Sequence, residues 1–239
     1  MQKKGKIETL NNKISSEFIA EVLNSDSGNL IKHQLLENPV IKSMYFNKAG
    51  LFYYKQKNYV KALEQFKKSL RIAEQLGDLN KKVIYLNNIG GIYKLLGNNC
   101  EALKAFKSII QISKQLGNLL LKATYLNRIG LIHHEQGDKY KIKERYPEAL
   151  EQFKQAMKQY KKVLQITEQL GSLQMKIICL NNIAGIYNAQ GNYPKALIQY
   201  EKALKILDSL GLNKTKNIKI IKNNINSIKK IMKKENNSN

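Results

Sequence analysis

A segment of about forty residues recurs four times along this chain. Gly50, Gly90 and Gly130 lie 40 residues apart, and Ala184 follows 54 residues later at the same place in the pattern. In three of the four segments an Ala-Leu pair follows, then an aromatic residue, then a Leu-Gly pair that closes the unit. Because self-similarity at a fixed period is the signature of repeat architectures, the chain is predicted to be an array of like units.

Each unit is predicted to be a pair of antiparallel helices. In the second unit the apolar residues between positions 83 and 96 recur at steps of three and four, which indicates one buried helical stripe. Gly97 ends that helix, and a second apolar stripe runs from Ala102 to the closing Gly117. Asn58, Asn98 and Asn192 stand where the second helices begin, as N-cap residues do.

The small residues at 50, 90, 130 and 184 are expected to let the two helices of each unit approach closely, with Ala62, Ala102 and Ala196 facing them.

The pattern resembles the tetratricopeptide repeat family, whose signature runs from a large apolar residue through Leu-Gly and Tyr to Ala-x-x-x-Phe. The resemblance covers residues 39–212. The chain departs from the family because Phe46, Leu86, Leu126 and Leu180 replace the usual Trp, and because the Pro that normally closes a unit is missing. The resemblance implies an all-α, right-handed superhelical solenoid of antiparallel helical hairpins with capping helices at its N- and C-terminal ends. It also implies a concave groove that holds peptides or partner helices.

Four units are predicted, at residues 39–78, 79–118, 119–172 and 173–212. The third carries a 14-residue insertion around residues 137–147, which we interpret as a longer hairpin or as a basic loop. Its second helix can be registered on Ala149 and Phe153 or, seven residues later, on Ala156 and Tyr160.

The two ends of the chain are predicted to cap the array. Residues 1–38 have the apolar pattern of a degenerate helical hairpin, and residues 213–239 form a basic C-terminal helix with a frayed tail. The apolar face of that last helix is predicted to be Ile220, Ile221, Ile225, Ile228 and Ile231.

The net charge of +23 would be typical of a nucleic-acid-binding protein, but its composition argues against that function. Of the 41 basic residues, 38 are Lys and three are Arg, and Asn and Ile are abundant beside Lys. Lys, Asn and Ile share A/T-rich codons, whereas proteins that grip phosphate rely on the planar fork of Arg. We therefore interpret most of the charge as a solvated surface and expect neither nucleic-acid nor membrane binding.

No catalytic or cofactor motif is present, so we expect a non-catalytic protein without a cofactor or a bound metal. His133 occupies a core position of the repeat, and His134 is expected to face the groove. The absence of a signal peptide, a membrane span and a cysteine framework predicts a cytoplasmic protein.

The groove is predicted to bind its partner through residues of the first helix of each unit. One offset of that helix holds Asn in all four units, namely Asn47, Asn87, Asn127 and Asn181. A row of carboxamides can pair with the main chain of an extended peptide whatever its side chains. Two alternative interpretations remain: the abundance of Asn fills the column, or the Asn side chains tie neighbouring hairpins together. The predicted binding residues, at this offset and two neighbouring ones, are Asn47, Lys48, Tyr54, Asn87, Asn88, Lys94, Asn127, Arg128, His134, Asn181, Asn182 and Asn188.

Lys48 and Arg128 make the predicted groove cationic, so an acidic peptide or one with a free C-terminal carboxylate would suit it. The chaperone-binding members of the resembled family grip such a carboxylate with five residues. Here Asn88 and Arg128 match, but Asn47, Leu51 and Thr124 do not. The predicted function is a protein–protein interaction adaptor or scaffold. The alternatives are a peptide-sensing regulator and a basic protein associated with nucleic acid or an anionic surface.

Overall fold

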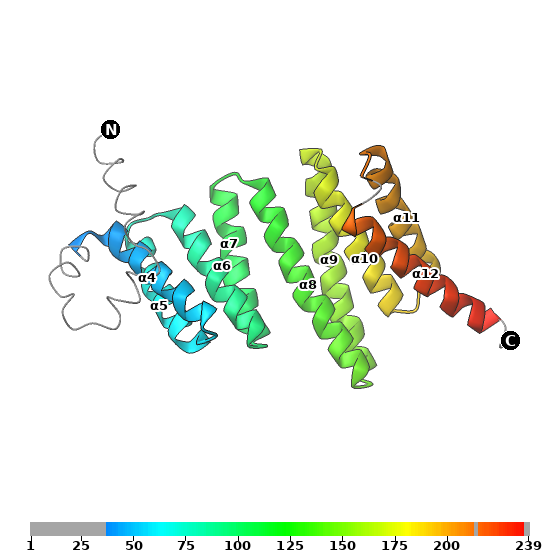
Figure 1. Ribbon diagram of the computed structural model, residues 1–239, viewed down its shortest axis with the longest axis horizontal. Helices are drawn as coiled ribbons and strands as arrows, with labels where there is room; N and C mark the ends of the chain where they lie inside the picture. The colour runs from blue at the N-terminus through cyan, green and yellow to red at the C-terminus, as the bar shows by residue number, and fades with distance from the viewer. Residues whose placement is uncertain (1–36, 213–214, 237–239) are drawn as a thin grey trace. The chain divides into compact units, whose positions relative to one another are not determined.

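The structure is a computed structural model that describes residues 37–212 and 215–236. These residues form nine helices and no strand. Seven helices are labelled α4 (Pro39–Lys55), α5 (Tyr59–Gln75), α6 (Leu79–Leu95), α7 (Asn99–Gln115), α8 (Leu119–Ile142), α9 (Tyr146–Leu170) and α10 (Leu173–Ala189). The last two are α11 (Tyr193–Ser209) and α12 (Lys216–Asn236). Consecutive helices pair as hairpins (Figure 1), which confirms the predicted all-α solenoid of antiparallel helical hairpins.

The chain divides into two compact units, and the boundary falls in the last turn of α7. The first unit ends at Ile112 and holds α4, α5, α6 and most of α7. The second begins at Ser113 and holds α8 to α12.

The predicted N-caps begin the second helices. The side-chain oxygen of Asn58 accepts a hydrogen bond from the Lys61 amide at 3.2 Å, and that of Asn98 accepts one from the Glu101 amide at 3.3 Å. Asn192 does the same for the Lys195 amide at 3.3 Å. Each bond satisfies an amide that the helix itself leaves without a partner, so the turn between the two helices is specified locally.

The close approach within the first three hairpins joins a glycine to an aromatic ring. A Cβ atom added to Gly50 would lie 2.6 Å from Cε1 of Phe66, and one added to Gly90 would lie 2.6 Å from Cε1 of Phe106. The rings of Phe66 and Phe106 are buried. At Gly90 the nearest side-chain atoms belong to Phe106 and Ala105, because the large ring reaches across the helix pair.

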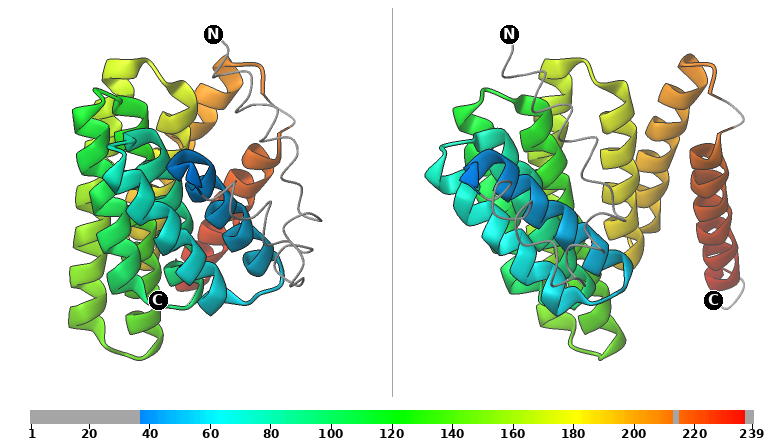
Figure 2. Two further views of the ribbon diagram at one scale, coloured as in Figure 1. Left: turned by 90° about the vertical axis from the view of Figure 1, so that its left-hand side faces the viewer. Right: turned by 60° about the vertical axis from the view of Figure 1, so that its left-hand side comes forward.

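The insertion in the third hairpin lengthens both of its helices. α8 has 24 residues and α9 has 25, whereas each of the other hairpin helices has 17. The turn between them is only Lys143 to Arg145, so the structure contains the longer hairpin and not the basic loop. Figure 2 shows this hairpin ending beyond the end of α10.

Both predicted registers of the third hairpin occur at once. A Cβ atom on Gly130 would lie 2.6 Å from Cε1 of Tyr160, and one on Gly137 would lie 2.5 Å from Cε1 of Phe153. Gly137 and Phe153 therefore repeat the contact of Gly130 and Tyr160 one heptad further along. Seven residues are close to two helical turns, so the insertion preserves the buried face of both helices.

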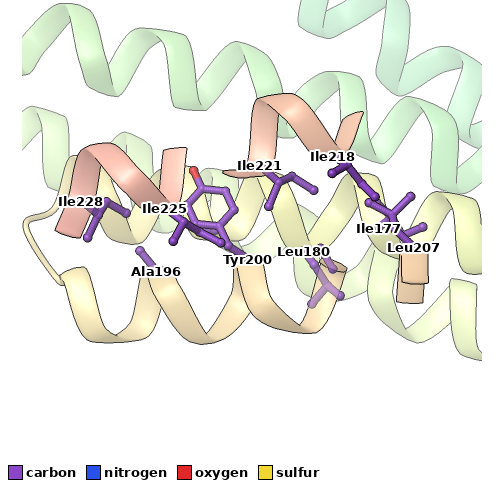
Figure 3. Packing of buried hydrophobic residues seen from close by; sticks show 11 residues of the cluster. Ile177, Leu180, Ala196, Tyr200, Leu207, Ile218, Ile221, Ile225 and Ile228 are labelled. Carbon is purple, nitrogen blue, oxygen red and sulfur yellow. The ribbon is translucent and has the colours of Figure 1, made fainter. Parts of the chain in front are cut away.

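The C-terminal helix α12 packs on the last hairpin (Figure 3). Its buried residues join a core cluster formed with α10 and α11: Ile218, Ile221, Ile225 and Ile228. The prediction for Ile220 and Ile231 is wrong, since these side chains are 43% and 39% exposed. The buried stripe begins instead at Ile218, which keeps the helical steps of three and four. The predicted N-terminal cap lies almost entirely outside the described residues.

Candidate peptide-binding face

The first helices of the first unit carry a chain of carboxamides. Nδ2 of Asn88 in α6 donates to Oδ1 of Asn47 in α4 at 3.1 Å. Nδ2 of Asn87 donates to Oδ1 of Asn88 at 3.5 Å. All three residues are half-buried. These three predicted residues are thus brought together, and one of their bonds joins consecutive hairpins.

The same bond recurs in the second unit. Nδ2 of Asn182 in α10 donates to Oδ1 of Asn127 in α8 at 2.9 Å. We call the offset of Asn47, Asn87, Asn127 and Asn181 the first column, and the next offset, with Lys48, Asn88, Arg128 and Asn182, the second column. In both units an Asn of the first column accepts a hydrogen bond from an Asn of the second column in the next hairpin. This finding agrees with the interpretation that these side chains tie hairpins together. It also leaves each accepting carboxamide its own two N–H groups, because the bond uses only the oxygen.

Asn181 differs from the other members of its column. Its Oδ1 is buried and makes no hydrogen bond, and the side chain lines a small cavity with Ile220 and Ile221 of α12. Asn224 holds in α12 the repeat position of Asn182, but it hydrogen-bonds to Tyr200. The series of Asn–Asn bonds therefore ends at α10, because Asn224 of the capping helix α12 has Tyr200 as its partner and not Asn181.

The other members of the predicted face differ in their burial and contacts. Lys48 is half-buried, and burial lowers its pKa. Arg128 is exposed, and its guanidinium lies 5.4 Å from the ring centre of Tyr125. Tyr54 is 41% exposed and packs against Tyr59. Two further predicted residues are Lys94, which is half-buried, and Asn188, which is exposed.

His134 lies between three helices of the second unit. Its ring packs edge-on against Phe153 at 5.9 Å, and its Nε2 lies 3.8 Å from the Asp138 carboxylate. A Cβ atom on Gly185 of α10 would lie 3.0 Å from its Cε1. Burial lowers the pKa of His134, against the opposing effect of Asp138. The side chain is 18% exposed, so it offers a ligand little surface.

His133 is half-buried, and its Nδ1 lies 2.8 Å from Oε1 of Gln152. The two adjacent histidines therefore have separate surroundings. Within residues 37–212 and 215–236, no three His, Cys, Asp or Glu side chains gather as metal ligands would.

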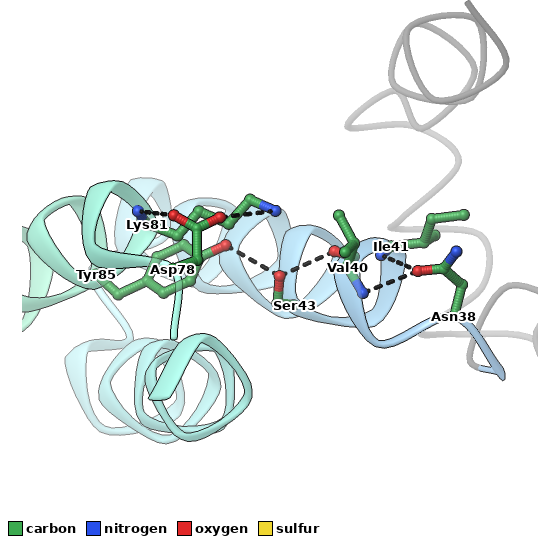
Figure 4. Close-up of polar contacts among 7 residues, drawn as sticks. All are labelled: Asn38, Val40, Ile41, Ser43, Asp78, Lys81 and Tyr85. Carbon is green, nitrogen blue, oxygen red and sulfur yellow. Dashed lines mark hydrogen bonds and ion pairs between the residues drawn. The ribbon is translucent and has the colours of Figure 1, made fainter. Parts of the chain in front are cut away.

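A second polar link between first helices was not predicted. The hydroxyl of Tyr85 in α6 donates to Oγ of Ser43 in α4 at 3.3 Å, and Ser43 donates to the Val40 carbonyl at 2.8 Å (Figure 4). Tyr85 and Ser43 are both buried. The sequence signal for this link was a serine placed among the apolar residues of the first helix.

A match to a known protein family agrees with the repeat pattern of the sequence. The sequence matches the model of a family described as tetratricopeptide repeat at residues 42–115, 83–162 and 140–209. A comparison with curated proteins gave no match. Throughout the described ranges, every helix is too short or too polar to cross a membrane.

Solved structures share the fold at low sequence identity. BtubC (BKLC) from P. vanneervenii is 18% identical over 90% of this chain and 84% of its own, with a TM-score of 0.65. The apo form of RapI is 19% identical over 89% of this chain and 82% of its own, with a TM-score of 0.60. Aspartyl phosphate phosphatase F from Bacillus subtilis is 17% identical over 86% of this chain and 51% of its own, with a TM-score of 0.58. At these identities the three proteins establish the fold alone.

Proposed function

The chain belongs to the tetratricopeptide repeat family, a family of protein-interaction modules, and from this premise we propose that it is an adaptor that binds a peptide along its first helices. The proposed binding elements are the carboxamides of the first and second columns. In each unit these side chains lie on neighbouring first helices and are held in place by a hydrogen bond between hairpins.

The Asn–Asn bonds support the proposal because they fix the geometry of the remaining donors. Asn47 and Asn127 use their oxygens toward the next hairpin, which orients their N–H groups. A side chain already held by a hydrogen bond loses little further entropy when a ligand binds. Carbonyl groups of an extended peptide are suitable acceptors for such N–H groups.

The charges near the carboxamides favour a peptide with a negative group. Lys48 and Arg128 lie beside the column residues Asn47 and Asn127. A peptide that ends in a free carboxylate is expected to bind more tightly than its C-terminal amide, because charge-assisted hydrogen bonds are stronger than neutral ones.

The test begins with a peptide selected from a displayed random library by the full-length protein. Replacing Asn87 and Asn127 with Ala is expected to abolish binding of that peptide in calorimetry, while circular dichroism remains helical. Replacement of main-chain amides of the peptide by esters, which weakens their carbonyl acceptors, tests whether these carbonyl groups are recognised. The matched control is Asn226→Ala, which removes an exposed Asn of α12 and should leave affinity unchanged. Undiminished binding by the double variant would refute the role of the carboxamides.

A further inference from the structure

A cavity of about 580 Å³ lies beside α9 in the second unit, away from the carboxamide columns. Its lining comes from one face of α9 and from the end of α10, and none of the twelve predicted binding residues takes part. Four lysines of α9 are among its lining residues: Lys154, Lys158, Lys161 and Lys162. All four side chains are exposed.

The positive charge of the α9 face that lines the cavity is not balanced by acidic residues in the same part of the helix. Between Glu151 and Glu168 the sequence contains four Lys and no Asp or Glu. Lys154, Lys158 and Lys162 follow one another at steps of four residues, which places like charges side by side on the helix surface. Such pairs of like charges four residues apart destabilise a helix.

In the second helices of the first unit, lysines form ion pairs with glutamates of the same helix. In α5, Glu64 accepts a bond from Lys68 at 2.6 Å, and in α7 Glu101 accepts one from Lys104 at 2.6 Å. When α9 is aligned on Ala156 and Tyr160, Lys158 takes the position of Glu64. In this register the ion pair of α5 is replaced by repulsion, and among residues 37–212 and 215–236 no ion pair to these lysines offsets it, so this face is a candidate functional site.

The cavity lining also contains apolar side chains. Phe153 and Met157 of α9 and Tyr187 of α10 also line the cavity. Phe153 is buried, whereas Met157 and Tyr187 are half-buried and partly accessible. The flexible, polarisable Met side chain adapts to different apolar partners. The site therefore combines positive charge with a partly accessible apolar surface.

We infer that this cavity binds an acidic segment of a partner protein, in which carboxylates flank one apolar side chain. The apolar residue would enter between Met157 and Tyr187, and the carboxylates would pair with the surrounding lysines. Four residues of helix span about 6 Å, so the Lys spacing suits glutamates placed four apart on a partner helix. A bare polyanion such as polyphosphate would leave the apolar surface unused.

The probe is a blocked synthetic peptide with one leucine between two pairs of glutamates, measured against full-length protein by fluorescence anisotropy. Binding should weaken as salt concentration rises, because exposed charges are screened. The same peptide with glutamine in place of glutamate should bind at least about tenfold more weakly. Replacement of its leucine by glycine should also weaken binding.

The diagnostic variant is Lys158→Glu combined with Lys161→Glu. It should weaken binding about tenfold or more without loss of fold, because Lys158→Glu puts a carboxylate four residues before Lys162, as Glu64 precedes Lys68. The matched control reverses two exposed lysines of the first unit, Lys67→Glu with Lys107→Glu, and should bind as wild type.

An equal loss in both variants would show a general charge effect and overturn the inference. Equal affinity for the glutamine peptide, or for the peptide without leucine, would also overturn it. The same holds if polyphosphate binds these lysines and the acidic peptide does not compete. The Asn87→Ala, Asn127→Ala protein should bind this probe normally, so failure here is distinct from failure of the carboxamide site.

Discussion

The ring of Phe153 lies against the backbone of Gly137 so closely that a Cβ atom on the glycine would sit 2.5 Å from Cε1 of the ring. Gly130 and Tyr160 make the same contact two turns away, at 2.6 Å. The third hairpin thus contains two of the contacts that each hairpin of the first unit contains once. This duplication explains how 14 extra residues fit without disturbing the hairpin.

We predict that Gly137→Ala lowers the free energy of unfolding by about 1–3 kcal/mol, the usual cost of overpacking a core. The clash involves a ring that is itself 3% exposed and cannot swing into solvent. Urea denaturation followed by circular dichroism measures the change. A loss near zero would show that Phe153 and its surroundings relax at little cost.

Gly91→Ala provides the matched control. Gly91 lies inside α6 next to Gly90, but a Cβ atom there would meet nothing within 4 Å. Alanine is the better helix former by about 0.5–1 kcal/mol, so this variant is expected to be more stable than wild type. Opposite signs for the two Gly→Ala variants would separate packing from helix propensity.

The fold could be predicted from sequence because its determinants are local and repeated. A cap such as Asn58 and a closing glycine such as Gly117 specify each helix within a few residues. The contact of Gly137 with Phe153 was missed because Gly137 lay in the insertion, where the pattern left a longer hairpin and a basic loop both open. The phase of α12 was misjudged for a different reason: its run of isoleucines offers more than one apolar stripe.

The candidate site was harder to predict, because sequence gives a column but not the partners of its side chains. Asn47 and Asn127 lie where the repeat places them, yet their oxygens are engaged by the next hairpin. Asn181 holds the same offset and has no such bond, since α12 replaces a further repeat. These differences arise from neighbours beyond the repeat unit, which a column of identical residues does not reveal.

Tyr160 gives a second test of packing, because its hydroxyl is buried without a hydrogen bond. Desolvation of such a group costs about 1–3 kcal/mol, so Tyr160→Phe is expected to raise the free energy of unfolding by about 1 kcal/mol. The ring that covers Gly130 is retained. Denaturation at pH 7 measures the gain, and a loss of stability would mean that the hydroxyl has a partner in solution.

The same residue predicts a dependence on alkaline pH. Burial raises the pKa of Tyr160 above its ordinary value of 10.0, so the folded state favours the neutral phenol. The free energy of unfolding does not depend on this group below about pH 10 and falls as pH rises beyond that, because the phenol ionises first in the unfolded chain. Tyr160→Phe should therefore lose less stability than wild type between about pH 10 and 11. Parallel curves for the two proteins would contradict this prediction.

The turns within the hairpins supply the last prediction. Gly97 and Gly191 adopt left-handed backbone angles, with φ of 74° and 75°, but Lys57 and Glu144 hold the same place with φ of 59° and 58°. The hydrogen bonds are equivalent: the Lys57 amide donates to the Tyr54 carbonyl at 2.9 Å and the Gly97 amide donates to the Lys94 carbonyl at 3.0 Å.

A side chain in the left-handed region costs about 1–2 kcal/mol, whereas glycine loses about 0.5–1 kcal/mol more in backbone entropy on folding. Lys57→Gly and Glu144→Gly are therefore each expected to stabilise the protein by about 0.5–1 kcal/mol in chemical denaturation. Lys57→Ala removes the same charge but keeps a Cβ atom, so it should show no such gain. If alanine stabilises as much as glycine, the effect comes from the lost charge and not from the backbone conformation.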